Sequence, residues 1–231
     1  WQLHGPDQFQ VGGAGRYTEK VVASDNTFFD DKGTWLIYAG PTNANNELVK
    51  DVIFERNFLN ALSGQSFALK SLSNITIRNN IVNLEIYLLD RAGTNNETGG
   101  LWPQNNIIDI SNNTYYSNST DNLDGLQIFS GTNISFKNNL AYAPNAAFTR
   151  MFIDSVGGNI ASNNSSNMQM KSTSPMFSSI PSASAKQLSA TDFKITVGSY
   201  GIGSGTSTST LSDFQMSIRS ITPKDMGALN H

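Results

Sequence analysis

Short runs of alternating apolar and polar residues fill most of the chain, and many of them end at an asparagine. The segment ITIRNN, residues 75–80, is typical: its isoleucines alternate with polar residues, and a doubled asparagine interrupts the run. A period of two predicts a half-buried strand, whereas asparagine is depleted in strands and favours turns. Each such run therefore predicts a strand that stops at a sharp corner.

The strand and its terminal asparagine recur at intervals of 23 to 33 residues. A period of this size predicts a solenoid, a propeller or an array. Loops of unequal length are compatible with a solenoid, because the entropy of loop closure grows only slowly with loop length. The repeated positions are Asn26, Asn57, Asn80, Asn113, Asn139 and Asn164.

Another short apolar run precedes most of these strands, and a third follows. Before the strand that ends at Asn57 comes WLIYAG, residues 35–40, and after it comes FLNAL, residues 58–62; in the first repeat the preceding run is WQLHG, residues 1–5. Three strands per repeat, each stacked in parallel on its counterparts, predict an all-β parallel β-helix of about six or more three-strand coils. We call the three strands of a coil its first, second and third faces. No amphipathic helix is visible.

The recurrent asparagine has a physical reason to occupy the corner between the second and third faces. Its amide carries both donors and acceptors, so stacked asparagines can donate to one coil and accept from the next. Asparagine also tolerates the left-handed backbone conformation that a sharp corner needs. The sequence thus predicts a ladder of asparagines along the helix.

Composition narrows the classes of function. The 231 residues carry a net charge of −3 with a pI near 5.3, which argues against nucleic-acid binding because that needs a basic surface. No apolar stretch is long enough to cross a membrane. The chain has no cysteine, which fits a bacterial exported protein and also many cytosolic ones.

The C-terminal quarter carries three motifs: SPMF at 174–177, DFKITVGSYGIGSG at 192–205 and DFQMSIRSITPKDMGALNH at 213–231. With the repeats they resemble the right-handed parallel β-helix of the pectate-lyase-like superfamily of bacterial carbohydrate enzymes. Two positions depart from that pattern: Ser174 replaces an aspartate, and Asn230 or His231 replaces a glutamate. The resemblance implies one β-helix domain, with an irregular first coil at 1–20, regular coils at 21–170 and a closing cap at 171–231. It also implies a protein that is secreted, on the cell surface or in the periplasm.

Such solenoids usually begin with a capping helix, and none is visible here. We therefore expect a preceding segment or another chain to complete the N-terminal coils. The alternative is a small cap made from residues 6–20.

The resemblance implies a substrate groove along the first face. Strand alternation predicts one outward column there: His4, Tyr38, Lys70, Asp90, Phe129 and Asp154. A one-residue shift in register would replace Asp90 by Leu89. A polysaccharide lyase needs a cation that neutralises the uronate carboxylate, a base and an acid; Lys70, Tyr38, Arg91 and His4 are the catalytic candidates. The competing interpretation is a solvated strand face with a Lys70–Asp90 ion pair.

Further residues are candidates for binding the substrate or a metal. The substrate candidates are Trp102, Gln127, Phe129, Arg150, Asp90 and Asp154. Asp121 and Asp124 suit either calcium or inverting glycoside hydrolysis, although a simple turn explains them as well. On the second face an outward row contains Ser24, Glu55, Arg78, Ser111, Lys137 and Ser162, in which Glu55 and Arg78 predict a cross-strand ion pair.

Three functions remain open. The first is a lyase acting on an acidic polysaccharide such as alginate or pectin, with no required cofactor but a role for Ca²⁺ left open. The second is a non-catalytic glycan-binding or tailspike-like β-helix, and the third is a glycoside hydrolase with paired aspartates. The chain lacks the catalytic motifs of pectate lyases, polygalacturonases and alginate epimerases, so no catalytic residue can be transferred by motif.

Overall fold

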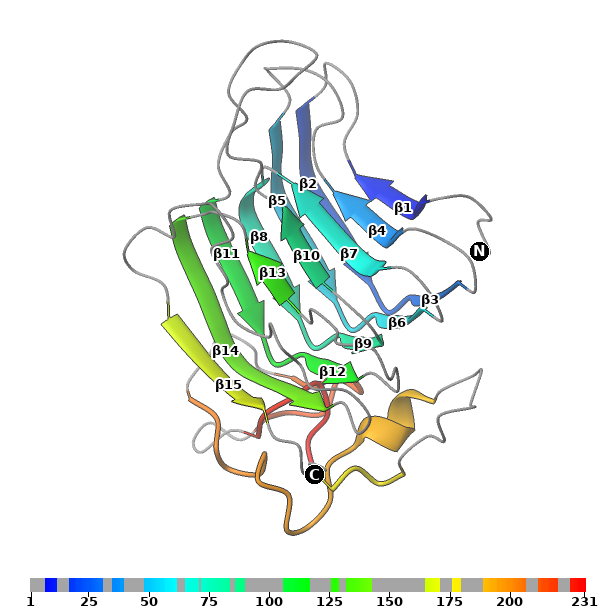
Figure 1. The fold of residues 1–231 in the computed structure, drawn as a ribbon, viewed down its shortest axis with the longest axis vertical. Coiled ribbons are helices and arrows are strands. Elements are labelled where there is room, and N and C mark those ends of the chain that lie inside the picture. Colours follow the sequence, from blue (N-terminus) through cyan, green and yellow to red (C-terminus); the bar gives the residue numbers. More distant parts are fainter. Residues whose placement is uncertain are drawn as a thin grey trace.

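The structure is a computed structural model of the 231-residue chain. It describes residues 7–11, 17–30, 35–39, 48–61, 65–70, 72–83, 86–89, 106–116, 126–128, 132–142, 165–170, 176–179, 189–206, 212–219 and 225–231. In these parts the fold is a parallel β-helix, as the repeats predict (Figure 1).

The first faces form a five-stranded sheet. Its strands follow one another in the order β1-β4-β7-β10-β13, and every neighbouring pair is parallel. Successive members therefore come from successive coils. The strands are β1 (Asp7–Val11), β4 (Trp35–Ala39), β7 (Gln65–Lys70), β10 (Ile86–Leu89) and β13 (Leu126–Ile128).

The second and third faces belong to one larger curled sheet, because the eleven-residue strand β14 (Thr132–Tyr142) runs through both. Its neighbours are parallel throughout, and Figure 1 shows the sheet bending around the corner. The other second-face strands are β2 (Tyr17–Ser24), β5 (Leu48–Glu55), β8 (Leu72–Arg78) and β11 (Asn106–Ser111). The strand β15 (Ser165–Met170) pairs with β14 on both sides of the corner. The other third-face strands are β3 (Thr27–Asp30), β6 (Phe58–Ala61), β9 (Ile81–Asn83) and β12 (Thr114–Tyr116).

The first coil differs from the sequence prediction. The strand that pairs with β4 is β1, with Asp7 opposite Trp35 and Phe9 opposite Ile37, whereas WQLHG at 1–5 was predicted to occupy this place. DQFQV carries the same alternation, so the local pattern does not distinguish the two segments. Pairing with Trp35 and Ile37 selects the second one.

The interior is filled by alternate residues of the second face. Phe54, Ile77 and Ile110 stand at one register level on successive strands and are fully buried. Burial of each such side chain stabilises the fold by about 1.5–3 kcal/mol. The intervening residues of these strands, such as Glu55 and Thr76, are partly exposed, so the period-two pattern of the sequence separates the core from the outer surface.

The asparagine ladder is present and runs in one direction. The Asn80 Oδ1 atom accepts hydrogen bonds from the backbone N–H and the Nδ2 of Asn57, at 2.9 and 3.1 Å. The Asn80 Nδ2 donates to Asn113 Oδ1 and to the carbonyl of Phe54, both at 3.0 Å. Each inner amide is thus satisfied by four hydrogen bonds. The described members are Asn26, Asn57, Asn80, Asn113 and Asn139.

The left-handed conformation belongs to a different residue from the one predicted. The residue before each ladder asparagine has a φ between 53° and 59°, and the ladder asparagines are not among the residues with positive φ. Corner and ladder roles are therefore divided between two consecutive residues, which explains the doubled asparagines. The corner residues are Asp25, Arg56, Asn79, Asn112 and Asn138.

The ladder changes at the fifth coil. The Nδ2 of Asn139 donates to the carbonyls of Ile110 and Lys137, at 2.9 and 3.1 Å. In the register of β15, Met168 stands opposite Asn139. The prediction that Asn164 is the sixth ladder member is therefore wrong: the register gives the position beside Asn139 to Met168, whose side chain has no amide.

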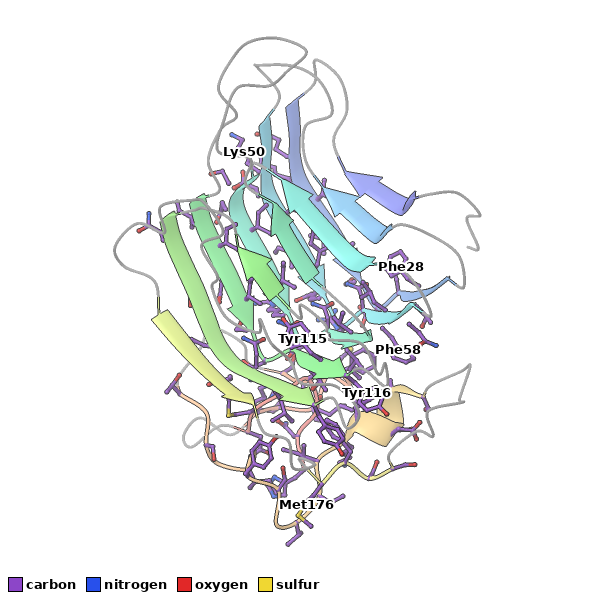
Figure 2. The ribbon with its side chains drawn as sticks, in the orientation of Figure 1. Phe28, Lys50, Phe58, Tyr115, Tyr116 and Met176 are labelled. Atoms are coloured by element: carbon purple, nitrogen blue, oxygen red, sulfur yellow. The ribbon has the colours of Figure 1, made fainter. Side chains whose placement is uncertain are left out.

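The C-terminal quarter closes the last coils. We call its described parts, 176–179, 189–206, 212–219 and 225–231, the closing segment. Phe193, in the 3₁₀ turn η1 (Ala190–Phe193), packs 5.2 Å from Tyr116 and 5.5 Å from Phe177 between ring centroids. Figure 2 shows Tyr116 beside this turn. These rings join Leu140 and other third-face residues in one buried cluster.

Arg219 fastens the closing segment to the corner of the third coil. It is 3% exposed, and its NH2 group donates to Asn79 Oδ1 at 2.9 Å and to the carbonyls of Gly227 and Ala228. Burial lowers its pKa to about 10, although the nearby carboxylates Asp213 and Asp225 oppose this shift. The corner residue Asn79 returns a hydrogen bond to the carbonyl of Ser212.

Candidate functional site

The first-face sheet places two tyrosines at one register level. Tyr38 in β4 stands opposite Ala68 in β7, Ala68 stands opposite Tyr87 in β10, and Tyr87 stands opposite Gln127 in β13. Gln10 in β1 completes the level on the other side of Tyr38. We call this set the first-face row. Neighbouring strands lie about 4.8 Å apart, so the two tyrosine backbones are separated by roughly 10 Å across Ala68.

Lys70 lies two residues beyond Ala68 and belongs to the next level of the same alternation. Its register partner is Leu89. The prediction that Tyr38 and Lys70 stand at the same level of one column is wrong. The residue opposite Tyr38 is Ala68, two residues before Lys70. Their Cα atoms are nevertheless only roughly 8 Å apart, from one strand spacing and two residue rises.

The β10 residue beside Lys70 is Leu89, which was the predicted alternative to Asp90. Ile86 pairs with Phe67 and Leu88 with Leu69, which sets Leu89 rather than Asp90 beside Lys70. The match between the apolar residues of the two strands decides the register, because a slip of one residue would exchange the faces of every side chain. Asp90 itself lies outside the described residues.

Tyr87 is the first-face residue that the sequence interpretation missed. It directly precedes the segment LLDRAG, in which the charged residues Asp90 and Arg91 were predicted as site residues. The signal that identifies it is the pair Ile86 and Leu88, whose alternation matches that of Phe67 and Leu69. Aligning apolar positions first, and polar positions afterwards, would have found it.

Many predicted site residues lie outside the described residues. Gln127 is described and joins the first-face row, and Tyr38 and Lys70 lie in β4 and β7. The others have no described position: His4, Arg91, Asp90, Trp102, Phe129, Arg150, Asp154, Asp121 and Asp124.

The predicted ion pair on the second face is confirmed. Glu55 Oε2 lies 2.7 Å from the NH2 of Arg78, and Glu55 Oε1 lies 2.9 Å from the NH1 of Arg56. Arg56 also makes two 2.7 Å hydrogen bonds to Asp25; they are the largest cause that lowers the pKa of Asp25. These two carboxylates and two guanidinium groups form a chain of ion pairs across three coils. Because each charge is paired with another, their role is structural.

Asp109 is a carboxylate of the second face whose pKa is raised by burial. It stands between Thr76 and Ser135 on the neighbouring second-face strands and is half-buried. Burial raises its pKa, although the charge of Lys137 and a hydrogen bond from Ser111 counteract the shift. A carboxyl group of this kind can retain a proton more readily than an exposed aspartate.

Within the residues that the structure describes, no group of three or more His, Cys, Asp or Glu side chains could hold a metal ion. Nor does any helix in the described part have the length and apolar character needed to cross a membrane. The predicted calcium candidates, Asp121 and Asp124, fall outside that part.

Comparisons of the chain with protein-family models, with curated proteins and with solved structures found no match. The assignment to a parallel β-helix therefore depends on the strand topology and the asparagine ladder themselves.

Proposed function

We propose that this protein is a carbohydrate-active β-helix, and specifically a polysaccharide lyase that cleaves a uronate-containing polymer by β-elimination. The proposal extends the sequence resemblance to the pectate-lyase-like superfamily. Two features carry it: the first-face row, in which Tyr38 and Tyr87 flank the small residue Ala68, and Lys70, which lies two residues beyond Ala68 in β7. Amphipathic aromatic rings and a cation are the groups that sugar rings and a uronate carboxylate require.

The chemistry assigns a role to each group. The substrate carboxylate must be neutralised so that the neighbouring carbon becomes acidic, and a base must then remove its proton. Lys70 is the candidate for the cation or the base, and Tyr38 is the candidate for proton transfer to and from the sugar. His4 and Arg91 remain candidates for the same tasks. Trp102, Phe129, Arg150 and Asp154 remain candidates for substrate binding.

A non-catalytic glycan-binding β-helix is the second candidate, and one observation favours it. Among the residues of the five first-face strands, only Asp7 and Lys70 are charged. Tyrosine and glutamine at the level of the first-face row, with a single lysine in these strands, are residue types that suit recognition of sugars as much as proton transfer.

The test is the ultraviolet absorbance of the unsaturated product. We would incubate the purified chain with alginate, pectate, chondroitin and hyaluronan, each with and without calcium. Lyase activity on one polymer is expected, and Tyr38→Phe and Lys70→Ala should each reduce it by about 10²–10⁴-fold, the usual effect of losing an acid or base.

The matched control is Lys50→Ala, because Lys50 lies on the second face in a half-exposed pair with Glu19. It should retain full activity. Glycan binding without any new product would overturn the lyase and favour the binding module. Full activity in both first-face variants would overturn this site.

A further inference from the structure

Three neighbouring strands of the second face carry a compact array of polar residues. β8, β11 and β14 lie side by side in register (Figure 1). Strands about 4.8 Å apart, and levels roughly 7 Å apart along each strand, bring these residues into one patch. We call this set the second-face array. It consists of Thr76, Asp109 and Ser135 at one level and Arg78, Ser111 and Lys137 at the next.

Asp109 occupies the middle strand of the array and is half-buried. Its diagonal neighbour Lys137 lies one strand and one level away, so their Cα atoms are roughly 8 Å apart. Glu55 holds Arg78 at 2.7 Å, whereas Lys137 forms no ion pair with a carboxylate of the described residues. The array therefore presents a fixed carboxyl group next to a cation that these carboxylates do not neutralise.

Ile107 provides an independent observation, because it precedes Asp109 by two residues on the same strand. It is 51% exposed and has a φ of 56°. The equivalent residues of β8 and β14 are Asn74 and Asn133, with φ of 56° and 55°. Asparagine adopts this conformation with little strain, whereas a β-branched residue does not. An exposed apolar side chain in a strained conformation points to contact with a ligand.

The array restricts the chemistry of that ligand. The carboxylate of Asp109 accepts hydrogen bonds and suits a partner with hydroxyl groups, whereas Lys137 suits an anion. A free phosphate or sulfate ion would meet the negative charge of Asp109, and a neutral sugar would leave Lys137 without a partner. Ile107 adds a surface for C–H groups. A hydroxylated ring with one anionic substituent satisfies all three residues.

The same geometry favours binding over hydrolysis. Hydrolysis of a glycosidic bond generally uses a pair of carboxyl groups that flank the bond. The array contains one, Asp109. Glu55 lies two strands away and is paired with Arg56 and Arg78, so it is not placed to supply the second.

We propose that the second-face array, together with Ile107, is a binding site for an acidic saccharide, a sugar ring that carries a carboxylate or a sulfate group. Asp109 accepts hydrogen bonds from ring hydroxyls, Ile107 contacts the C–H groups, and Lys137 binds the anionic substituent. The site lies on a different face from Tyr38 and Lys70, and the inference does not depend on the proposed lyase activity.

The location of binding can be tested by NMR of the full chain with labelled isoleucine methyl groups. The probes are galacturonate, galactose 6-sulfate and galactose, which share one ring and contain no glycosidic bond that a lyase could cleave. At neutral pH and millimolar concentration, at least one acidic sugar should shift the Cδ1 methyl signal of Ile107, and galactose should shift it much less. A response to only one of them identifies the anionic group. The shift should persist in Lys70→Ala, because that change lies on the first face.

Variants then test the individual contacts, with affinities followed at the backbone amide signal of Asp109. Lys137→Gln removes the charge and should weaken binding of the acidic sugar by about tenfold, whereas Lys137→Arg should retain it. The matched control is Lys50→Ala, which removes a second-face lysine that is paired with Glu19 and should leave the affinity unchanged. Ile107→Asn should weaken binding by about fivefold while relieving backbone strain, so unfolding cannot explain the loss.

Four results would overturn the proposal. They are the absence of an Ile107 shift with either acidic sugar, an equal shift with galactose, unchanged affinity in Lys137→Gln, and loss of the shift in Lys70→Ala. Unchanged affinity in Ile107→Asn would remove Ile107 from the site. None of these results depends on turnover of a polymer, so failure of the lyase proposal is distinguished from failure of this one.

Discussion

Substitution of Asn80 should be among the most destabilising single changes in the β-helix. Its amide is fully buried and makes four hydrogen bonds: it accepts two from Asn57 and donates one each to Asn113 and Phe54. In Asn80→Ala these partners lose their hydrogen bonds in an interior that water cannot easily enter. At about 1 kcal/mol for each bond, and more for each buried group left unsatisfied, the expected loss is roughly 4 kcal/mol or more.

The ladder supplies its own control. Asn26 has the same chemistry, but it is exposed and connects to the ladder on one side only. Water can replace the amide there, so Asn26→Ala should cost about 1 kcal/mol or less. The two variants introduce the same alanine at equivalent corners, so the difference between them reports the burial of Asn80 and its two additional hydrogen bonds.

The assay is urea unfolding monitored by circular dichroism, with the free energy of unfolding obtained by linear extrapolation. Since domains of this size are stable by about 5–15 kcal/mol, Asn80→Ala should retain only about 1–11 kcal/mol of unfolding free energy at 25 °C, which the urea midpoint can resolve. If Asn80→Ala does not fold, Asn80→Ser provides a milder step that keeps one hydroxyl. Equal stabilities of the Asn26 and Asn80 variants would refute the idea that the buried ladder holds the coils together.

Three further predictions concern single residues outside the ladder. Ile107→Asn should raise the free energy of unfolding by about 1 kcal/mol in the same urea assay, because Ile107 is a β-branched residue held at a φ of 56° with half of its surface exposed; no gain would show that this strain is relieved elsewhere. Gly227→Ala should lower the melting temperature by several degrees, since a Cβ there would stand 2.8 Å from Thr114 Oγ1 on a backbone with φ of +86°; an unchanged melting temperature would contradict this packing. Asp225 should stabilise the closing segment in a pH-dependent way: burial alone would raise its pKa, but hydrogen bonds from His231 and the backbone outweigh this and lower it. Its contribution is therefore complete above the unfolded-state pKa near 3.9 and is lost as the pH falls through the lower folded-state pKa. Asp225→Asn should accordingly show a shallower loss of stability between about pH 5 and pH 2, and parallel curves would refute the assignment.

The repeated pattern of the sequence determined the class of fold. Alternation in segments such as 75–80 placed the isoleucines in the core, and the regular return of asparagine predicted the ladder. These features could be predicted because they depend on neighbours within a few residues and on one repeating contact. The Glu55–Arg78 pair could be predicted for the same reason, since equivalent positions in adjacent coils are juxtaposed.

The candidate site was predicted less well because it depends on register. Local alternation fits Asp90 or Leu89 beside Lys70 equally well, and only the pairing of Ile86 and Leu88 with β7 selects Leu89. The same pairing brings Tyr87 into the first-face row. A shift of one or two residues changes no local preference, but it changes every neighbour on the adjacent strand.

The tertiary structure alone decided how the corners and the closing segment work. The sequence determined that asparagines form the corner, but not that the first of each pair adopts the left-handed conformation while the second stacks. It also contained Arg219 and Gly227 without indicating that one fastens the closing segment to Asn79 and that the other has no space for a side chain beside Thr114. These contacts join residues more than one hundred positions apart. They exist only once the coils have formed a surface, whereas the strands and the ladder are already specified by each repeat and its nearest neighbours.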